Sequence, residues 1–268
     1  MIQFDHVVKT FPGATTPAVR NFTLDIPARS TTVLVGSSGS GKTTLLRMIN
    51  RMVEPTEGRV LIDGEDLAGV DPVKLRRSIG YVMQNSGLLP HRTVADNIAT
   101  VPRLNGVPRK QARERAAELL ELLGLDGSLA KRYPSELSGG QAQRVGVARA
   151  LADDPNILLM DEPFGAIDPV VRRDLQEQIL DLQEKISKTI VLVTHDIDEA
   201  FLLGDNIVLL EMGARIAQAG TAEDFVTAPA SDFVASFVGT QDRELTLRER
   251  DGTTVAVDRH GRVKGVVR

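Results

Sequence analysis

The chain has 268 residues, of which 42% are apolar and 25% charged, a composition typical of a globular protein that buries a large core. A net charge of −4 gives no basic surface for general nucleic-acid binding, and the absence of cysteine excludes disulfides and thiolate metal sites. No apolar run approaches the roughly 20 residues that span a bilayer, and no signal peptide is visible, so we expect a cytoplasmic chain that meets a membrane only through a partner.

The first part of the chain predicts short strands and then a strand–loop–helix unit. Residues 1–30 alternate apolar and polar positions between Pro and Gly breakers, which is typical of antiparallel strands. Residues 32–35 are a buried strand that runs into a glycine-rich loop, and a helix is expected over 44–52. Further strands are expected over 60–62, before an Asp63-Gly64 turn, and over 79–83, ending at Gln84.

The second part predicts a helical segment followed by parallel strands. From about 94 to 152 the periodicity is helical, and it is clearest over 109–123, which Gly124 ends. Continuous apolar runs at 157–160, 190–193 and 207–210 fit a parallel sheet covered on both faces, with a helix over 171–186. After Met212, a short strand and two small helices lead to a polar, hairpin-like tail over 241–268.

Residues Gly36–Thr43 match the phosphate-binding loop in its required context, between a strand and a helix. The glycines let successive backbone N–H groups point inward at an anion, and the following helix adds its positive end. Lys42 is expected to contact the β- and γ-phosphates of ATP and Thr43 to bind Mg²⁺. The alternative is a flexible loop with a solvated lysine. The candidate nucleotide-binding residues here are Gly36, Ser37, Ser38, Gly39, Ser40, Gly41, Lys42, Thr43 and Thr44.

Four polar side chains follow predicted core strands, at the end where ligands bind in open α/β sheets. Asp161 is expected to hold Mg²⁺ through water, and Glu162 to polarise the attacking water as general base. His195 is placed to contact the γ-phosphate and orient water, and Gln84 to sense metal and water. Taken singly, the two acids could be a helix cap, and His195 or Gln84 a structural residue.

Leu137–Gln141 precedes a predicted helix over 142–151. Its serine could simply cap that helix. A serine and bare glycine N–H groups at a helix start also form an anion site, which two copies of the chain related by a two-fold axis would present to each other's nucleotide. The candidate nucleotide-binding residues here are Ser138, Gly139, Gly140 and Gln141.

Together these motifs resemble the nucleotide-binding subunit of ATP-binding cassette (ABC) transporters over about residues 1–240. In the terms of that family, the matches are the Walker A motif (Gly36–Thr43), the Walker B motif (Ile157–Asp161), the catalytic glutamate (Glu162), the Q-loop (Gln84), the signature motif (Leu137–Gln141) and the switch histidine (His195). Phe11 falls where the family usually has a tyrosine that stacks on adenine, although a packed lobe residue is an equal alternative. Gly165 replaces the more usual serine of the D-loop.

The resemblance implies an α/β fold of the P-loop NTPase, RecA-like type, with a mainly parallel core sheet, an antiparallel N-terminal lobe and an inserted helical lobe. It implies an ATPase domain over 1–240 with a helical subdomain at about 88–152, and a β-rich tail over 241–268. Two subunits would enclose ATP and Mg²⁺, and integral-membrane permease subunits near the Q-loop would receive the motion. A substrate-binding protein would take part indirectly.

Residues 79–98 and 161–169 resemble the quaternary-amine importers, which take up glycine betaine, choline, carnitine or proline. In the first of these segments, Leu88 and Leu89 are expected to be exposed toward the permease; the alternative is that both are ordinary core residues. Residues 254–267 resemble one strand–turn–strand of a CBS regulatory module. The tail is too short for a whole module, so we expect either a remnant or the start of a module that has been cut away. The alternatives are an importer of another small polar solute, an exporter subunit, a regulatory cassette that does not hydrolyse ATP, and a soluble ABC ATPase outside transport.

Overall fold

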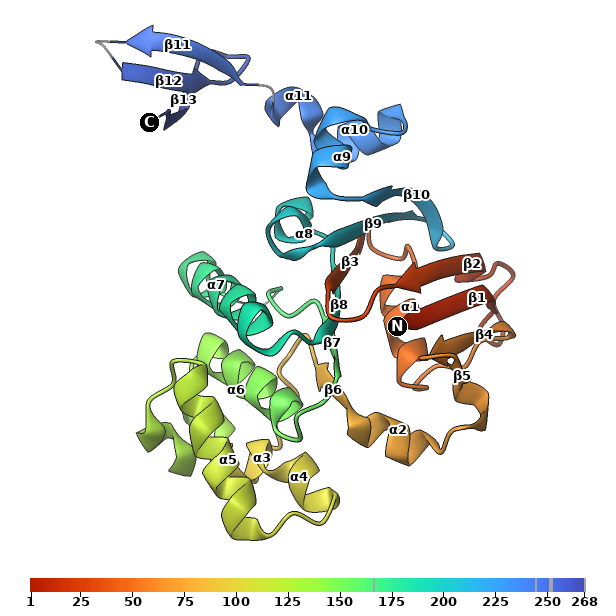
Figure 1. Cartoon of the computed structure of the whole chain (residues 1–268), viewed down its shortest axis with the longest axis vertical. Helices are drawn as coiled ribbons and strands as arrows, with labels where there is room; N and C mark the ends of the chain where they lie inside the picture. Colours follow the sequence, from red (N-terminus) through yellow and green to blue (C-terminus); the bar gives the residue numbers. More distant parts are fainter. Residues whose placement is uncertain (166, 244, 251–252, 268) are drawn as a thin grey trace.

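The computed structural model describes residues 1–165, 167–243, 245–250 and 253–267. Two sheets pack around a shared helix, a lobe of helices lies beside the larger sheet, and a small C-terminal sheet projects from the body (Figure 1). Within the described residues, none of the helices has the length and apolarity that crossing a membrane requires.

The N-terminal sheet is antiparallel, as the alternating pattern of residues 1–30 predicts. Its strand order is β2 (Val19–Ile26), β1 (Ile2–Lys9), β4 (Glu57–Ile62) and β5 (Glu65–Asp66). Alternate apolar residues turn inward, and the rings of Phe4 and Phe22 meet edge to face with their centroids 5.2 Å apart. This sheet therefore buries one face and leaves the other to solvent.

The core sheet confirms the predicted parallel arrangement. Its order is β10 (Arg215–Gly220), β9 (Asn206–Glu211), β3 (Thr31–Gly36), β8 (Thr189–Thr194), β7 (Ile157–Asp161) and β6 (Ile79–Val82). All neighbours are parallel except β10, which runs antiparallel to β9. Every residue of β3, β7 and β8 is buried, because helices or the other sheet cover both faces.

Successive residues of β3 enter different cores, as the two-residue period of a strand requires. Leu34 packs in one core with Phe4 of β1 and with Leu45 and Leu46 of α1 (Lys42–Ile49), so that α1 lies between the two sheets. Val33 packs in a second core, against the helices on the opposite face. Helix α1 starts two residues before the predicted position and ends three before it, since Arg51 takes the left-handed conformation with φ 55°.

The remaining helices divide between the two regions and the tail. Helix α2 (Pro72–Ser78) joins the sheets, and the helical lobe contains α3 (Val94–Ile98), α4 (Thr100–Leu104), α5 (Arg109–Leu122) and α6 (Gly139–Leu151). Helices α7 (Pro169–Ile186) and α8 (Ile197–Leu203) follow β7 and β8. Helices α9 (Ala222–Thr227), α10 (Asp232–Val238) and α11 (Thr240–Arg243) lead to the tail, and short 3-10 turns occupy 67–69, 127–131 and 134–136.

The C-terminal tail and the segment that follows Gln84 differ in how far they agree with the sequence-based predictions. The tail forms three antiparallel strands, β11 (Thr246–Arg250), β12 (Thr253–Val257) and β13 (Val263–Val266). Leu88 and Leu89 are half-buried rather than exposed, and Leu88 packs against the core of the helical lobe. The expectation of free leucines was wrong because the helices that follow fold back over this segment.

Candidate nucleotide site

The glycine-rich loop joins β3 to α1 at the carboxyl edge of the core sheet. A Cβ atom on Gly36 would lie 2.3 Å from the carbonyl oxygen of Leu210 in β9, so no larger residue fits where the strand turns into the loop. Gly41 begins α1 in the left-handed conformation, with φ 99°, and offers no side-chain cap. Within the described part of the chain, the first N–H groups of α1 therefore have no side-chain acceptor, which suits an anionic ligand.

Lys42 is folded into the loop that it follows. Its side chain is almost fully buried, and Nζ donates to the carbonyl oxygens of Gly36 (2.7 Å) and Ser37 (2.8 Å). Burial lowers the pKa of the lysine, while the carboxylates of Glu162 and Asp161 raise it. The ammonium group thus lies in the field of both carboxylates that end β7.

Three side chains hold the Asp161 carboxylate. Thr43 Oγ1 donates to Oδ1 at 3.0 Å, and Oδ2 accepts from the Tyr81 hydroxyl at 2.9 Å and from Arg47 Nη2 at 3.2 Å. Burial, as the largest cause, raises the pKa of Tyr81 to about 12, so the hydroxyl stays a donor at neutral pH. The structure thereby brings the two residues expected at a metal ion, Thr43 and Asp161, into direct contact.

Glu162, His195 and Gln84 converge beside this pair. The Glu162 backbone is in the left-handed region, with φ 45°, which is uncommon for a side-chain-bearing residue and turns it off the end of β7. Glu162 Oε2 lies 3.3 Å from His195 Nδ1. A Cβ atom on Gly165 would be 3.5 Å from Gln84 Nε2 and 3.8 Å from Glu162 Oε2, so the amide and the carboxylate flank the same glycine.

A buried acid lies behind the histidine. Glu199 of α8 is 7% exposed, accepts a hydrogen bond from Thr194 Oγ1 at 2.5 Å, and lies 3.9 Å from Arg172 Nη1 of α7. Burial raises the pKa of this carboxyl, outweighing the hydrogen bond and the arginine. The group ties the strand end that carries His195 to the helix that follows Gly165.

The signature motif lies apart from this cluster in the chain's own fold. Ser138 Oγ accepts a hydrogen bond from the backbone N–H of Gln141 at 3.3 Å, and the backbone N–H of Ser138 donates to Gln141 Oε1 at 3.0 Å. The two bonds form a reciprocal cap at the start of α6. The capping role considered from the sequence is therefore present, yet Ser138 and Gly139 stay exposed. Figure 1 shows α6 in the helical lobe, whereas α1 lies beside the antiparallel sheet.

Gly140 marks a close approach of two helices. A Cβ atom there would come within 2.1 Å of Val171 Cγ1 at the start of α7. Phe11, the remaining sequence candidate, is 39% exposed, with Lys9 Nζ 5.2 Å from its ring centroid. An accessible ring of this kind is compatible with stacking on a base.

Tyr81, Arg47 and Glu199 were missed by the sequence reasoning. Tyr81 pairs with Leu159 in the β6–β7 register, and Leu159 shares a face of β7 with Asp161 two residues on. That register is the signal that would have found the tyrosine. It becomes visible only once the neighbouring strands are known.

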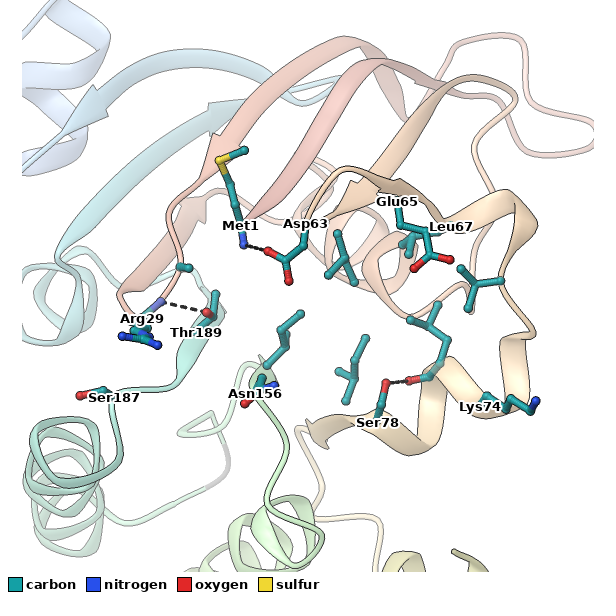
Figure 2. Close-up of a pocket in the computed structure, with 16 residues that line it drawn as sticks. Met1, Arg29, Asp63, Glu65, Leu67, Lys74, Ser78, Asn156, Ser187 and Thr189 are labelled. Atoms are coloured by element: carbon teal, nitrogen blue, oxygen red, sulfur yellow. Dashed lines mark hydrogen bonds and ion pairs between the residues drawn. The ribbon is translucent and has the colours of Figure 1, made fainter.

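A hollow of about 700 Å³ lies at the opposite end of the core sheet (Figure 2). It is lined by Met1, Asp63, Lys74 and Asn156 among others, and by Thr189, the first residue of β8. No residue of the phosphate loop lines it. The hollow therefore has no part in the candidate nucleotide site.

The donor set fits Mg²⁺ bound together with a nucleotide. Among the residues that the structure describes, no group of three or more His, Asp or Glu side chains could hold a metal ion. Mg²⁺ commonly takes one or two protein oxygens and fills its remaining positions with water and phosphate oxygens. The Thr43 hydroxyl and the Asp161 carboxylate, 3.0 Å apart, are such a pair.

Comparison with known proteins agrees with this geometry. The family profile described as ABC transporter matches residues 19–165. The carnitine transport ATP-binding protein OpuCA of Listeria monocytogenes is 48% identical over 256 residues, covering 96% of this chain and 64% of that protein. The glycine betaine uptake system ATP-binding protein YehX of Escherichia coli is 50% identical over 251 residues, with coverages of 92% and 80%.

Solved structures give the same result. A dimeric ATP-binding cassette in a post-hydrolysis state, bound to ADP and Pi, is 34% identical with a TM-score of 0.75, covering 82% of this chain and 98% of that one. The cbiO1 protein from Clostridium perfringens, part of an ABC transporter complex, is 26% identical with a TM-score of 0.76 and coverages of 85% and 90%. The chain spans 62% to 65% of the length of the first carnitine, osmoprotectant and choline relatives that it matches.

Proposed function

The chain belongs to the ABC transporter family, and we propose that it is the ATP-hydrolysing subunit of an importer for a quaternary-amine osmoprotectant such as glycine betaine, choline or carnitine. The observation that carries the ATPase part is the meeting of Glu162, His195 and Gln84 beside the Thr43–Asp161 pair, at the carboxyl edge of the core sheet. Relatives of about half-identical sequence, named for these solutes, support the substrate class.

In this proposal the phosphate loop binds ATP, and side chains at the ends of the core strands catalyse its hydrolysis. The loop amides of residues 36–41 and the N–H groups at the start of α1 bind the ATP phosphates, with Lys42 supplying a buried positive charge and Phe11 stacking on the base. Thr43, Asp161 and Gln84 would hold Mg²⁺, which supplies charge neutralisation at the phosphates. Glu162 takes the proton of the attacking water, and His195 keeps its carboxylate oriented.

A second copy of the chain completes the site. Ser138, Gly139, Gly140 and Gln141 of one subunit would contribute donors to the nucleotide of the other, which agrees with the exposure of Ser138 and Gly139 and with the dimeric state of a similar cassette. Integral-membrane permease subunits would receive the motion, and a substrate-binding protein would deliver the solute. We place the subunit at the cytoplasmic face of the membrane.

We propose the same domain division that the family resemblance implies. The ATPase domain would span residues 1–240, with the helical subdomain at about 88–152, and residues 241–268 would form a tail whose strand pairing is confined, among the described strands, to its own sheet. The similarity of residues 254–267 to a CBS strand–turn–strand supports a relationship between the tail and that regulatory module.

The test separates the ATPase from the substrate. Cells lacking the gene receive the wild-type chain or Glu162→Gln, and uptake of labelled glycine betaine, choline and carnitine is measured under osmotic stress, beside phosphate release by the purified proteins. We expect both activities to be lost in Glu162→Gln while ATP binding is retained. Normal uptake in the deletion strain, with no redundant importer expressed, would refute the substrate class. Near-normal turnover by Glu162→Gln would remove this residue from the base role.

A further inference from the structure

The segment that carries Gln84 is held by the helix that begins at the signature motif. On α6, Gln143 is buried and its Nε2 donates to the carbonyl oxygen of Met83 at 3.0 Å. Two turns along the same helix, Arg149 donates from Nη1 to the carbonyl oxygen of Gly87 at 2.6 Å and from Nη2 to that of Ser86 at 2.7 Å. The backbone on both sides of Gln84 is thus bonded to one helix.

These contacts come from a single face of α6. Positions 143, 146 and 149 are spaced three residues apart, so consecutive members are neighbours on the helix surface and the whole set covers about a third of the helix circumference. Gly146 stands between the two polar residues, and a Cβ atom there would already be 3.4 Å from the Ser86 carbonyl oxygen. The glycine therefore permits the close approach, and the polar residues fix the segment on either side of it.

The contacts of Arg149 point to a role in holding the segment that carries Gln84. Among the residues that the structure describes, no carboxylate pairs with its guanidinium, whose partners are the two carbonyl oxygens. Burial lowers the pKa of this arginine, which agrees with its half-buried position. A half-buried charge satisfied only by backbone oxygens of one short segment is a strong constraint on that segment.

We propose that Gln143 and Arg149 are positioning residues that make the segment Met83–Gly87 move as one unit with α6. The inference rests on the proposed ATPase function. The proposal connects the two nucleotide sites of a dimer. The start of α6 would contact the nucleotide bound to the partner, whereas Gln84 would contact the nucleotide bound to its own chain. Engagement of Ser138 at the partner's site would then set Gln84 in its own site, so hydrolysis at the two sites would be coupled.

The first experiment measures position without relying on ATP hydrolysis. Amide hydrogen exchange of residues 84–88 is followed in the wild-type chain, Arg149→Met and Gln143→Leu. We expect protection of the Ser86 and Gly87 N–H groups, which donate to carbonyl oxygens within the segment, to fall about 10- to 100-fold in each variant, because a segment released from α6 opens more easily. Arg76→Met is the matched control, because Arg76 also donates to two backbone carbonyl oxygens, those of Asn50 (3.2 Å) and Arg51 (2.5 Å), outside the segment.

The second experiment asks whether Arg149 acts through Gln84. Arg149→Met and Gln84→Ala should each lower kcat about tenfold with little change in the KM for ATP, and the double variant should be no slower than either single one. Arg149→Lys, which keeps the charge and one donor direction, should recover part of the loss. The Hill coefficient for ATP should fall toward one in Arg149→Met.

The outcomes separate this inference from the proposed function. Unchanged exchange of residues 84–88 in the variants that fold, or losses in kcat that multiply in the double variant, would overturn the inference while leaving the ATPase intact. If Arg149→Met does not fold, Gln143→Leu decides by the same two measurements. A wild-type chain without ATPase activity would refute the proposed function, and hydrogen exchange would still decide whether α6 holds the segment.

Discussion

Three side chains around Asp161 fix the orientation of its carboxylate at the end of β7. The carboxylate has acquired three donors of different kinds: a hydroxyl from the phosphate loop, a guanidinium from α1 and a phenol from the neighbouring strand β6. Only Thr43 belongs to a recognisable motif. Arg47 and Tyr81 share Oδ2 and leave Oδ1 to the threonine, so the carboxylate is oriented before any metal arrives.

Tyr81→Phe tests this orientation. Removing the phenol leaves Oδ2 with Arg47 alone, and we expect the free energy of unfolding to fall by about 1–2 kcal/mol in urea titrations. The Mg²⁺ concentration that half-saturates nucleotide binding should rise, while nucleotide binding without Mg²⁺ should not change. Tyr133→Phe is the control, since Tyr133 is the chain's other tyrosine and is 46% exposed. Equal stability of Tyr81→Phe and wild type would show that Tyr81 does not hold the carboxylate.

Glu199 gives a pH-dependent prediction. Its folded pKa is raised above the ordinary value of 4.5, so the folded state holds this proton more tightly than the unfolded chain does. The stability that the proton contributes is complete below the unfolded pKa and is lost as pH rises through the folded pKa. Glu199→Gln lacks this loss. Its free energy of unfolding relative to wild type should therefore increase as pH rises above the ordinary glutamate pKa.

Urea unfolding at several pH values, with the exposed Glu118→Gln as control, measures this difference. A difference between Glu199→Gln and wild type that stays flat across the range would mean that Thr194 and Arg172 fully compensate the burial of the carboxylate.

At the scale of elements, most of the fold was predictable from the sequence because several core strands are entirely apolar. The continuous apolar runs at 157–160 and 190–193 are shorter than a typical helix, and their apolarity is typical of strands in a parallel sheet that is covered on both faces. The phosphate loop was equally predictable, because both its tight backbone turns and its binding of an anion through N–H groups require glycine at these positions. The partners of Asp161 and of the Met83–Gly87 segment were not predictable, since they depend on strand register and on which face of α6 turns inward.

The packing of α6 on α7 gives a prediction at this scale. Gly140→Ala places a methyl group within 2.1 Å of Val171 Cγ1, so the valine side chain or the helices themselves must shift where the start of α6 meets the start of α7. Gly140→Ala should destabilise the chain, and Val171→Ala should remove part of that cost. We expect a coupling energy of about 1 kcal/mol or more in a double-mutant cycle of thermal or urea unfolding. Additive effects would show that the helices adjust without contact between these residues.

The C-terminal sheet projects from the rest of the molecule, residues 1–243, which we call the body. Among the described strands, β11, β12 and β13 pair only with one another, and Figure 1 shows this sheet projecting beyond α11. Arg243, just before it, still belongs to the body, because it pairs with Asp198 and its guanidinium lies 4.9 Å from the ring centroid of Phe201.

A chain that ends after Arg243 should therefore keep the body intact. We expect its melting temperature to change by less than about 2 °C and its ATPase activity to match that of the full chain, because no core residue or sheet partner of the body is lost. A chain that ends after Val238 is the matched comparison, and it should be less stable because the Arg243 contacts go with it. A large loss of stability on truncation after Arg243 would show that the tail sheet docks on the body.

Assembly is the property of the whole molecule on which the ATPase proposal depends. Ser138 and Gly139 are exposed at the start of α6, in a part of the fold separate from the phosphate loop, so one chain alone leaves both surfaces incomplete. A ligand that binds across two chains stabilises their association by mass action. The Glu162→Gln chain should therefore be monomeric without nucleotide and dimeric with Mg-ATP in light-scattering measurements.

Ser138→Arg in the same background should stay monomeric at all ATP concentrations, since a bulky guanidinium would occupy the space of the partner's phosphates. Ser128→Arg, an exposed position outside α6, is the control for added charge and should dimerise normally. A dimer that forms without nucleotide and tolerates Ser138→Arg would place the contact on another surface, and the site built from Lys42, Asp161 and Glu162 would then have to work without a partner's signature motif.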